Sequence, residues 1–304
     1  MNRELKEEYK TLPEGDYHLC FDRLEGRLLF TSEEDYRQGM AGVALSTLKF
    51  GVDIYAFDLM PNHLHAILHG TGVQCMKMFS FQKRRLSEQL IKSGRRPLPD
   101  DYGCKLIPIP DKESLKAQIL YCVRNPYEKG YCSPDGHRWG SGYLFFNELA
   151  CLIPGIPVSS LSLAKVRLYC ASREILPPEW EVHPQLGILP RNFVNVEKVE
   201  QLFGSVKEYH TRLVKEYEMV VKIARSLDEE VSFSPVEIRE IVYSELRNAY
   251  PGRPFKSISP EEKCRVAVRL HESHGLDSFQ LSHVLHLSEL AITQAIRSKD
   301  YGIQ

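Results

Sequence analysis

FDLMPNHLHAILHG, residues 57–70, is an apolar run with two histidines, His63 and His65, separated by one leucine. This alternation predicts a β-strand, because successive side chains of a strand point to opposite faces. The two imidazoles would then share one face with Cα atoms roughly 7 Å apart, close enough to bind one metal ion. His69 lies roughly 13 Å from His65, so we expect it to be a polar residue at the strand end. The alternative, an ordinary polar strand face, stays open.

A third ligand and a reactive group have to come from another segment, and residues 111–126 are the best source. At 3.6 residues per turn this segment predicts a helix with an apolar stripe. Tyr121 and Asn125 lie one turn apart on another face of it. Pro126 disfavours helical geometry at the preceding residue, so we expect the helix to end near Asn125, with its amide at the open end. The alternative is a surface tyrosine beside a capping asparagine.

Three sequence blocks together resemble the HUH single-strand transposases, in particular the REP-associated tyrosine transposases, which use one catalytic tyrosine. The blocks are Tyr17-His18-Leu19-Cys20-Phe21 through Arg27-Leu28-Leu29-Phe30, Met60-Pro61-Asn62-His63-Leu64-His65, and Tyr121-Cys122-Val123-Arg124-Asn125-Pro126. They occur in the family's order within roughly residues 13–147, about half of the chain. The resemblance implies that His63, His65 and Asn125 bind a divalent metal ion and that Tyr121 is the nucleophile.

The chemistry implied by this resemblance is the cutting and rejoining of single-stranded DNA. A tyrosine hydroxyl has a reference pKa near ~10 and is a weak nucleophile, so it needs a polarised phosphate. A metal ion would act as the Lewis acid, and Mg²⁺ or Mn²⁺ is expected, with imidazole favouring Mn²⁺. In the family the covalent link is to the 5′ end of the DNA, and the substrates are hairpins or repeats. Arg124, from the third block, is expected to contact the DNA.

The overall composition is that of an ordinary protein of 304 residues, with 43% hydrophobic and 26% charged residues, a formal net charge of -1 and a pI of about 6.8. Two domains are expected at this length. A near-neutral charge gives no general affinity for nucleic acid, because phosphate binding relies on lysine and arginine. Locally, residues 83–96 hold six basic residues and one acid. We expect Lys83, Arg84 and Arg85 to contact the backbone of a DNA hairpin; a solvated helix face is the alternative.

Neither a membrane-spanning segment nor a signal-peptide core is found in the sequence, which predicts a cytoplasmic protein. The eight cysteines are scattered, without a Cys-x-x-Cys pair or spacing typical of zinc sites. They are therefore expected to be reduced and buried thiols.

The predicted elements of the first half follow the order β-β-α-β-β-α-β-α. They are two short strands flanking a loop at 22–26, a helix from Thr31 or Ser32 to about Phe50, a strand at 52–59, the histidine strand, a helix at 74–92, a strand at 105–109 and the Tyr121 helix. This order predicts an α+β fold with a ferredoxin-like antiparallel sheet and helices packed over it. The histidine strand should be central, and the Tyr121 helix should cross its histidine face.

The domain organisation follows from composition and spacing. A catalytic domain of the HUH type is expected at residues 1–147. Its last part, 127–147, is rich in glycine and aromatic residues, which are expected mainly to pack in the core, with base stacking as the alternative. Residues 148–230 hold several prolines and are expected to be a linker and helical region, to which we assign no chemistry. Residues 231–304 are expected to form a helical domain of the helix-turn-helix type.

The C-terminal prediction rests on the helical spacing of apolar residues. A helix at 261–273 is followed by a glycine and by two short helices with a tight turn, within 279–297. The second short helix would direct Thr293, Gln294 and Arg297 outward, residue types suited to base edges and phosphates. Duplex DNA is therefore an expected partner of this region. A helical hairpin without DNA contact is the alternative.

Two other functions stay open from the sequence. A replication initiator or relaxase would share the histidine pair and the tyrosine, although the sequence has no helicase or Walker motif. A domesticated regulator would bind DNA through the C-terminal region without cutting it. The sequence leaves open the DNA site, the choice between monomer and homodimer, and whether the tyrosine works with the metal site of its own chain or of a partner.

Overall fold

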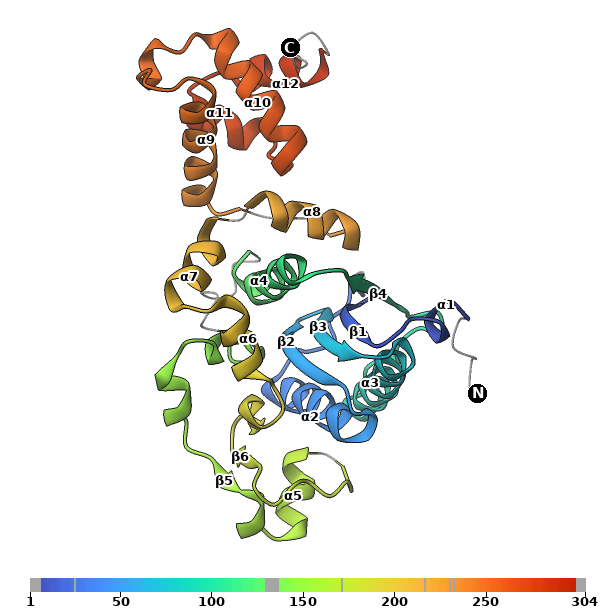
Figure 1. The fold of residues 1–304 in the computed structure, drawn as a ribbon. Coiled ribbons are helices and arrows are strands. Elements are labelled where there is room, and N and C mark those ends of the chain that lie inside the picture. The colour runs from blue at the N-terminus through green and yellow to red at the C-terminus, as the bar shows by residue number, and fades with distance from the viewer. Residues whose placement is uncertain are drawn as a thin grey trace. The chain divides into compact units, whose positions relative to one another are not determined.

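The computed structural model describes residues 7–24, 26–128, 137–170, 172–215, 217–229, 231 and 233–298. The chain divides into two compact units, residues 1–213 and 214–304, and each unit has its own hydrophobic core (Figure 1). The roles assigned from the sequence to residues 1–147, 148–230 and 231–304 stay predictions.

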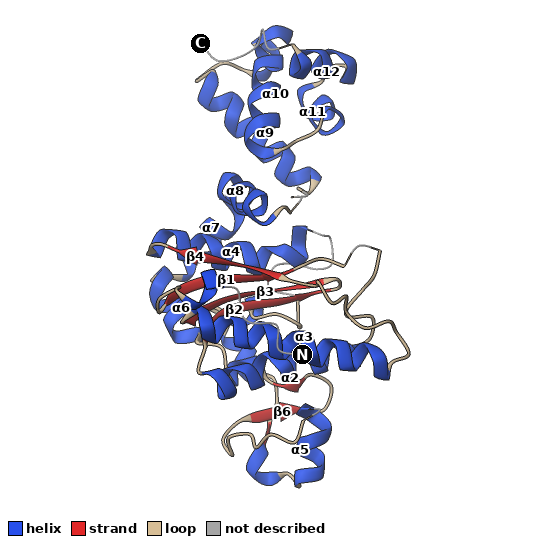
Figure 2. Cartoon of the chain, turned by 90° about the vertical axis from the view of Figure 1, so that its right-hand side faces the viewer, coloured by secondary structure: helices blue, strands red, loops and turns tan. Residues whose placement is uncertain are grey.

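A four-stranded antiparallel sheet forms the centre of the first unit. Its strands are β1 (Gly15–Phe21), β2 (Asp53–Met60), β3 (His63–Gly70) and β4 (Cys104–Ile109), in the order β2-β3-β1-β4. One face is covered by α2 (Glu33–Phe50) and α3 (Gly72–Lys92), and the other by α4 (Lys112–Glu128) (Figure 2). The predicted α+β class with an antiparallel sheet is confirmed. The histidine strand β3 is an inner strand, and α4 crosses it, as expected.

The register of the two inner strands decides which side chains face α4. Phe21 of β1 packs edge-on against Phe79 of α3, with ring centroids 5.0 Å apart, so this side of β1 faces α3. Cys20 lies on the opposite side and is directly across from His65. Because residues directly across an antiparallel pair point to the same face, the even-numbered residues of β1, His18 among them, share the histidine face of β3.

The helix ends follow the sequence signals. Ser32 caps α2 and forms a reciprocal capping box with Asp35, and Gly51 ends the helix in the left-handed conformation at φ 63°. Thr71 and Gln74 form the same box at the start of α3. Such boxes satisfy backbone N–H groups that have no partner inside the helix. The predicted start of α2 at residues 31–32 and its end at Phe50 are therefore confirmed.

Residues 27–30 form no strand, so the predicted hairpin with β1 is wrong. The N–H groups of Leu29 and Phe30 both donate to the carbonyl of Pro61, at 2.7 and 3.0 Å. Both side chains are fully buried. The segment buries its apolar side chains over the turn between β2 and β3. Its N–H groups bond to that turn and are therefore not available to pair with β1 in a hairpin.

Helix α4 continues through Pro126 to Glu128, so the prediction that it ends near Asn125 is also wrong. A proline removes one backbone hydrogen bond of the helix and crowds the preceding turn, but packing outweighs this loss of stability here. Arg124 and Asn125 are each only 2% exposed, so tertiary contacts hold this turn in place. The position of Asn125 is therefore set by a continuous helix rather than by an open helix end.

The outer edge of β2 is covered by a later segment that approaches it closely. Gly140 forms a β-bridge with Asp58. A Cβ atom at Gly140 would lie 2.9 Å from the Asp58 carboxylate and 3.1 Å from the backbone oxygen of Phe57, so the approach requires glycine. The expected core role of the aromatic residues is confirmed for three described ones, which are buried: Trp139, Tyr143 and Phe145.

The remaining elements up to residue 215 are short. They are α1 (Glu7–Lys10), α5 (Leu163–Cys170), α6 (Val196–Phe203), α7 (Val206–Lys215), an antiparallel sheet of β5 (Ile156–Pro157), β6 (Glu181–His183) and β7 (Gly187–Ile188), and the 3-10 turns Gly142–Leu144, Glu148–Leu152, Val158–Ser160 and Pro190–Asn192. The small sheet was not predicted, because its strands are only two or three residues long and carry no alternating pattern.

The described part of the second unit is helical. It contains α8 (Tyr217–Leu227), α9 (Pro235–Ala249), α10 (Pro260–His274), α11 (Ser278–Leu285), α12 (Glu289–Arg297) and the 3-10 turn Phe255–Ser257. Gly275 ends α10 in the left-handed conformation at φ 69°, and His286 does the same for α11 at φ 54°. The predicted helix, its glycine break and the two short helices that follow are confirmed as elements.

Within the described ranges, no helix combines the length and the apolar character that a membrane crossing needs. The described cysteines are thiols rather than disulfides, and most are buried, namely Cys20, Cys75, Cys122, Cys170 and Cys264, with Cys104 half-buried. The expectation of reduced thiols is confirmed for these residues.

Candidate metal and nucleophile site

The face of the sheet beneath α4 carries a cluster of polar side chains from three elements. His63 and His65 come from β3, His18 from β1, and Tyr121 and Asn125 from α4. Each of them is 2% exposed or less. The structure thus brings together all four residues that the sequence predicts as metal ligands and nucleophile, and it adds a third histidine.

Two side chains, those of His63 and Asn125, meet the Nε2 atom of His65 within this cluster. The Nε2 atoms of His63 and His65 lie 2.8 Å apart, and the Asn125 amide lies 3.0 Å from the same Nε2 atom of His65. The far side of His63 is held as well, because its Nδ1 atom lies 2.8 Å from the Asn62 side-chain oxygen. The converging groups come from sequence positions 60 residues apart and are aligned by the crossing of α4 over β3.

The spacing of these groups fits a small divalent ion. Two ligand atoms at right angles on an octahedral ion with bonds of about 2.1 Å are about 3 Å apart, and the separations here are 2.8 and 3.0 Å. A half-turn of the Asn125 amide exchanges its nitrogen for its oxygen, which is the atom that binds metals. With that turn, His63, His65 and Asn125 could offer two imidazole nitrogens and one amide oxygen to a divalent ion.

The Tyr121 ring lies against this donor set. Its centroid is 5.8 Å from that of His65, edge-on at 89°, and 6.0 Å from that of His18. One helical turn separates Tyr121 from Asn125, so the hydroxyl-bearing ring and the amide share one face of α4. Of the two tyrosines that follow, Tyr127 belongs to α4 by its backbone and Tyr131 lies outside the described residues.

Sequence reasoning missed two residues of the cluster, His18 and Gln118. His18 Nε2 lies 3.0 Å from His65 Nδ1, and His18 Nδ1 lies 2.6 Å from the Gln118 side-chain oxygen. These pairs are 47 and 100 residues apart in the chain. The alternation of β1 places His18 on one of its faces, but only the pairing of β1 with β3 shows that this is the histidine face.

His69, the third histidine of β3, stays apart from the cluster, as expected. Its Nδ1 atom lies 2.7 Å from the Asp16 carboxylate, and its Nε2 atom lies 3.5 Å from that of Glu14. It therefore belongs to a partly exposed, hydrogen-bonded group at the strand end.

A buried acid on β2 lies on the same face as the cluster. Asp58 is directly across from His65 in the sheet and is 1% exposed. Its carboxylate lies 3.1 Å from Nε2 of His137. Burial acts to lower the pKa of His137, but the Asp58 carboxylate and the Leu59 carbonyl outweigh it, so the pKa of His137 is raised. The Asp58 carboxylate and the His137 imidazole thus lie against each other beside the histidine strand.

The basic segment at residues 83–96 lies on the other side of the sheet, on and after α3. Lys83 donates to the backbone oxygens of Asp100 and Tyr102 at 2.9 and 2.6 Å, and Arg85 donates to that of Cys170 at 3.1 Å. Lys83 therefore holds the segment before β4, and Arg85 holds the end of α5. Arg84 is exposed and lies over the ring of Phe81, one turn earlier on α3.

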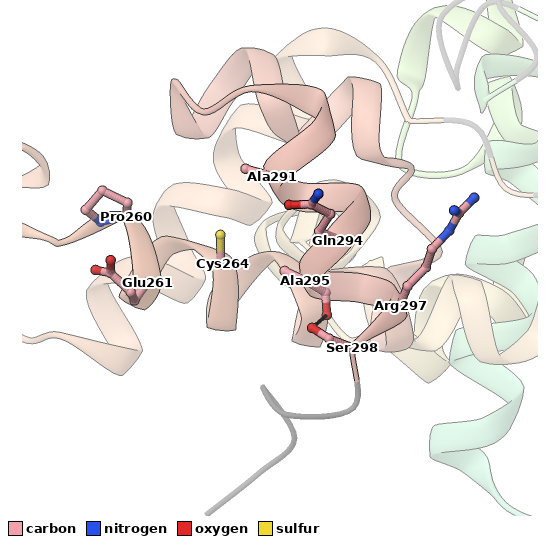
Figure 3. A pocket seen from close by; sticks show the side chains of 8 residues that line it. All are labelled: Pro260, Glu261, Cys264, Ala291, Gln294, Ala295, Arg297 and Ser298. Atoms are coloured by element: carbon pink, nitrogen blue, oxygen red, sulfur yellow. Dashed lines mark hydrogen bonds between the residues drawn. The ribbon is translucent and has the colours of Figure 1, made fainter.

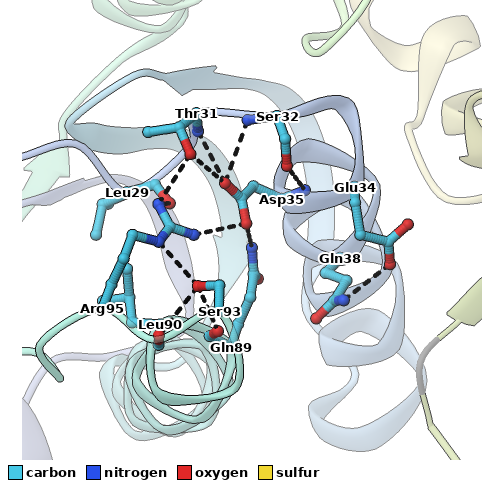
Figure 4. Close-up of polar contacts among 10 residues, drawn as sticks. All are labelled: Leu29, Thr31, Ser32, Glu34, Asp35, Gln38, Gln89, Leu90, Ser93 and Arg95. Carbon is cyan, nitrogen blue, oxygen red and sulfur yellow. Dashed lines mark hydrogen bonds and ion pairs between the residues drawn. The ribbon is translucent and has the colours of Figure 1, made fainter.

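Arg95, from the same segment, is part of a buried network with α2 (Figure 4). It donates to one carboxylate oxygen of Asp35 at 2.6 Å, and Gln89 donates to that oxygen at 2.7 Å. The other oxygen accepts from the N–H groups of Thr31 and Ser32 at 2.9 and 3.2 Å. Burial acts to raise the pKa of Asp35, but these hydrogen bonds and the Arg95 charge outweigh it and lower the pKa.

Arg124 is the predicted DNA contact that lies closest to the cluster in sequence, and it is 2% exposed. Its guanidinium donates to the backbone oxygen of Leu213. The side chain thus joins α4 to α7. A phosphate contact by Arg124 stays a prediction.

The predicted contacts on α12 lie at the surface of the second unit. Gln294 and Arg297 are exposed, and Thr293 is half-buried. Gln294 and Arg297 border a hollow of about 680 Å³ between α10 and α12, which Cys264, Ala291 and Ala295 also line (Figure 3). The Glu261 carboxylate borders the same hollow, so the surface carries both signs of charge.

Comparison with known proteins gives one structural likeness. No family model matches the chain, and no curated protein matches it at a significant level. The solved structure of a REP-associated tyrosine transposase bound to a REP hairpin aligns with 47% of this chain and 84% of that chain, at 13% sequence identity and a TM-score of 0.38. A TM-score this low does not by itself establish a shared fold.

Proposed function

We propose that this protein is a metal-dependent, single-strand DNA endonuclease and strand transferase that uses Tyr121 as its nucleophile. The observation that carries the proposal is the contact of His63 and Asn125 with the Nε2 atom of His65, whose ring lies beside that of Tyr121. Residues that the sequence predicts as ligands and nucleophile thus lie side by side in the folded protein. A chance grouping would not be expected to bring all four together.

We infer that the first unit belongs to the ferredoxin-like type of α+β fold. The chain order β1-α2-β2-β3-α3-β4 and the sheet order β2-β3-β1-β4 support this, with both connecting helices on one face. That arrangement leaves the opposite face of the two inner strands for α4 and the metal ligands. The site therefore depends on an additional helix that follows the last strand of the sheet.

His63 and His65 would hold a Mn²⁺ or Mg²⁺ ion through their Nε2 atoms, with the Asn125 oxygen as the third protein ligand. When bound, the ion supplies Lewis acidity to the scissile phosphate. Tyr121 attacks that phosphate, so that the bond from its oxygen to phosphorus forms and the bond from phosphorus to the 3′ oxygen breaks. The phenol loses its proton to solvent, and the leaving 3′ oxygen takes one up. The product is a 5′-phosphotyrosine link and a free 3′-OH.

The position of Tyr121 on a helix fixes its approach to the DNA. A side chain on a continuous helix above a sheet has little freedom to move, so an accessible single strand is a better substrate than a stacked duplex. Hairpins with single-stranded flanks are the substrates that we propose.

We propose that the second unit binds duplex DNA through α12. Helices α11 and α12 are joined by a short turn at His286, and this arrangement supports a helix-turn-helix. Gln294 and Arg297 supply an amide and a guanidinium at the exposed surface, with Thr293 beside them. In the first unit, Arg84 is the residue of the predicted trio whose side chain is exposed, so we assign a phosphate contact to it before Lys83 or Arg85.

The test is an adduct assay on a library of hairpin oligonucleotides with single-stranded flanks, incubated with Mn²⁺ or with EDTA. We expect a covalent protein–DNA adduct with Mn²⁺ that is absent with EDTA. An end label on the 3′ side of the cut should remain with the protein, and a 5′ label should appear on a free fragment. Hairpin binding without any adduct would point to a non-cleaving regulator, and a 5′ label on the protein would contradict the proposed polarity.

A further inference from the structure

A chain of hydrogen bonds leads from α4 through β1 to the metal-facing histidine of β3. Gln118 lies one turn before Tyr121 on α4 and contacts His18, which in turn contacts His65. His18 and His65 are both 0% exposed. The Gln118 oxygen is 2.6 Å from His18 Nδ1, and His18 Nε2 is 3.0 Å from His65 Nδ1.

The direction of these hydrogen bonds decides which nitrogen of His65 carries a proton. With the Gln118 oxygen facing His18, as the structure has it, that oxygen can only accept, so His18 Nδ1 carries the hydrogen. A neutral His18 then has a lone pair on Nε2, which accepts a hydrogen from His65 Nδ1. His65 is therefore left with its lone pair on Nε2, the atom that meets His63 and Asn125.

The same rule applies to His63. Its Nδ1 atom lies 2.8 Å from the side-chain oxygen of Asn62, which accepts that hydrogen and leaves the lone pair on Nε2. The Nε2 lone pairs of His63 and His65, whose atoms lie 2.8 Å apart, are then both available to one divalent cation. Partners that fix the tautomer of a ligating histidine also raise its affinity for the metal.

We propose that Gln118 and His18 form a positioning relay that holds His65 in the tautomer with the hydrogen on Nδ1, so that Nε2 is presented to a divalent cation. This inference rests on the proposed function for its biological purpose, but it describes a property of the resting protein. The relay also joins the helix of the nucleophile to the ligand strand through β1. A Gln118 amide turned the other way would reverse every hydrogen bond and place a hydrogen on His65 Nε2, which would exclude a metal ion.

The experiment reads the tautomer of His65 directly, in full-length protein labelled with ¹⁵N-histidine. Long-range ¹H–¹⁵N spectra at neutral pH distinguish the two tautomers, and the His65 signals are assigned from their loss in His65→Gln. We expect the hydrogen on Nδ1. In His18→Phe, which keeps a ring of similar size, His65 should lose this preference. Affinity for Mn²⁺, measured from the EPR signal of the free ion, should fall about 10- to 100-fold.

Two further variants separate positioning from packing. Gln118→Glu keeps an oxygen that can only accept, so both the tautomer and the Mn²⁺ affinity should be retained, whereas Gln118→Leu should lose both. Gln118 is only partly buried, so these changes test the relay even if His18→Phe fails to fold. The matched control is His69→Phe on the same strand, whose partners are Asp16 and Glu14; it should change neither readout.

The inference is overturned if His65 carries its hydrogen on Nε2 in the unaltered protein. It is also overturned if Gln118→Leu leaves the tautomer and the Mn²⁺ affinity as they were. Neither readout depends on DNA cleavage. If the relay responds as expected but no adduct forms on any hairpin, the relay stands and the proposed nuclease function fails. If an adduct forms but the relay does not respond, the nuclease function stands and the relay fails.

Discussion

Replacing Asp35 with alanine should destabilise the first unit much more than the same change at its neighbour Glu34. The Asp35 carboxylate joins the start of α2 to Gln89 and Arg95 and is nearly buried (Figure 4). Removing one partner of a buried ion pair costs about 3–5 kcal/mol of unfolding free energy, and a lost helix cap about 1 kcal/mol. The Arg95 side chain keeps 24% exposure, so the lower end of the first range applies, and the two losses together amount to about 4 kcal/mol.

The control lies one residue away in the same first turn. Glu34 is exposed, and its partners Arg37 and Gln38 are on the same helix surface, so Glu34→Ala should cost about 0.5 kcal/mol or less. Urea unfolding followed by tryptophan fluorescence measures both changes. The two tryptophans of the chain, Trp139 and Trp180, lie in the first unit. With a urea slope of about 1–3 kcal/mol per molar, Asp35→Ala should lower the midpoint by about 1 M or more.

The pH dependence of stability gives a second, independent test of the Asp35 network. The pKa of Asp35 is lowered in the folded protein, so its contribution is fully present above the unfolded-state pKa near ~3.9 and is lost as the pH falls through the folded-state value. The difference in free energy of unfolding between the unaltered protein and Asp35→Ala should therefore be large at pH 7 and small below about pH 4. A loss of stability in Asp35→Ala no larger than that in Glu34→Ala, or one that does not change with pH, would refute the role given to this network and to Arg95.

Three other variants test separate parts of the account. His63→Ala should abolish Mn²⁺-dependent nicking and leave hairpin binding unchanged, as measured by gel shift; undiminished nicking would remove His63 from the metal site. Arg297→Ala should reduce the salt dependence of duplex binding by about one phosphate contact, whereas Arg253→Ala, which removes a residue paired with an acid inside the unit, should not; equal slopes would argue against α12. Gly140→Ala should lower the free energy of unfolding by about 1–3 kcal/mol because its Cβ would overlap Asp58. The matched control is Gly15→Ala, whose Cβ meets no close atom; its loss of stability in urea unfolding should be less than half as large.

Local signals predicted the elements that carry the site. The alternation in residues 57–70 predicted β3, and the capping residues Ser32 and Thr71 mark the starts of α2 and α3. The one-turn spacing of Tyr121 and Asn125 survives, although Pro126 does not end the helix. These features depend on neighbours within about four residues, which is the range over which a sequence pattern can be interpreted by itself.

The features that were missed depend on partners far away in the chain. Residues 27–30 have the composition of a strand, but their N–H groups pair with the turn before β3. His18 looked like any polar strand residue until its neighbour across the sheet was known. Lys83 and Arg85 were predicted from their charge to contact DNA, and the fold adds that both donate to backbone carbonyls; their contact with DNA stays a prediction. Charge patterns show that a cation is present, and only the fold shows what it contacts.

The most direct test of the central claim is to locate the DNA-linked residue by mass spectrometry after nuclease trimming of the adduct. Trypsin places the three competing tyrosines on three different peptides, 117–124 with Tyr121, 125–129 with Tyr127 and 130–138 with Tyr131. If Tyr121 is the nucleophile, we expect a nucleotide on peptide 117–124, its absence in Tyr121→Phe, and its retention in Tyr127→Phe. A nucleotide on either of the other two peptides, or an adduct that persists in Tyr121→Phe, would contradict it.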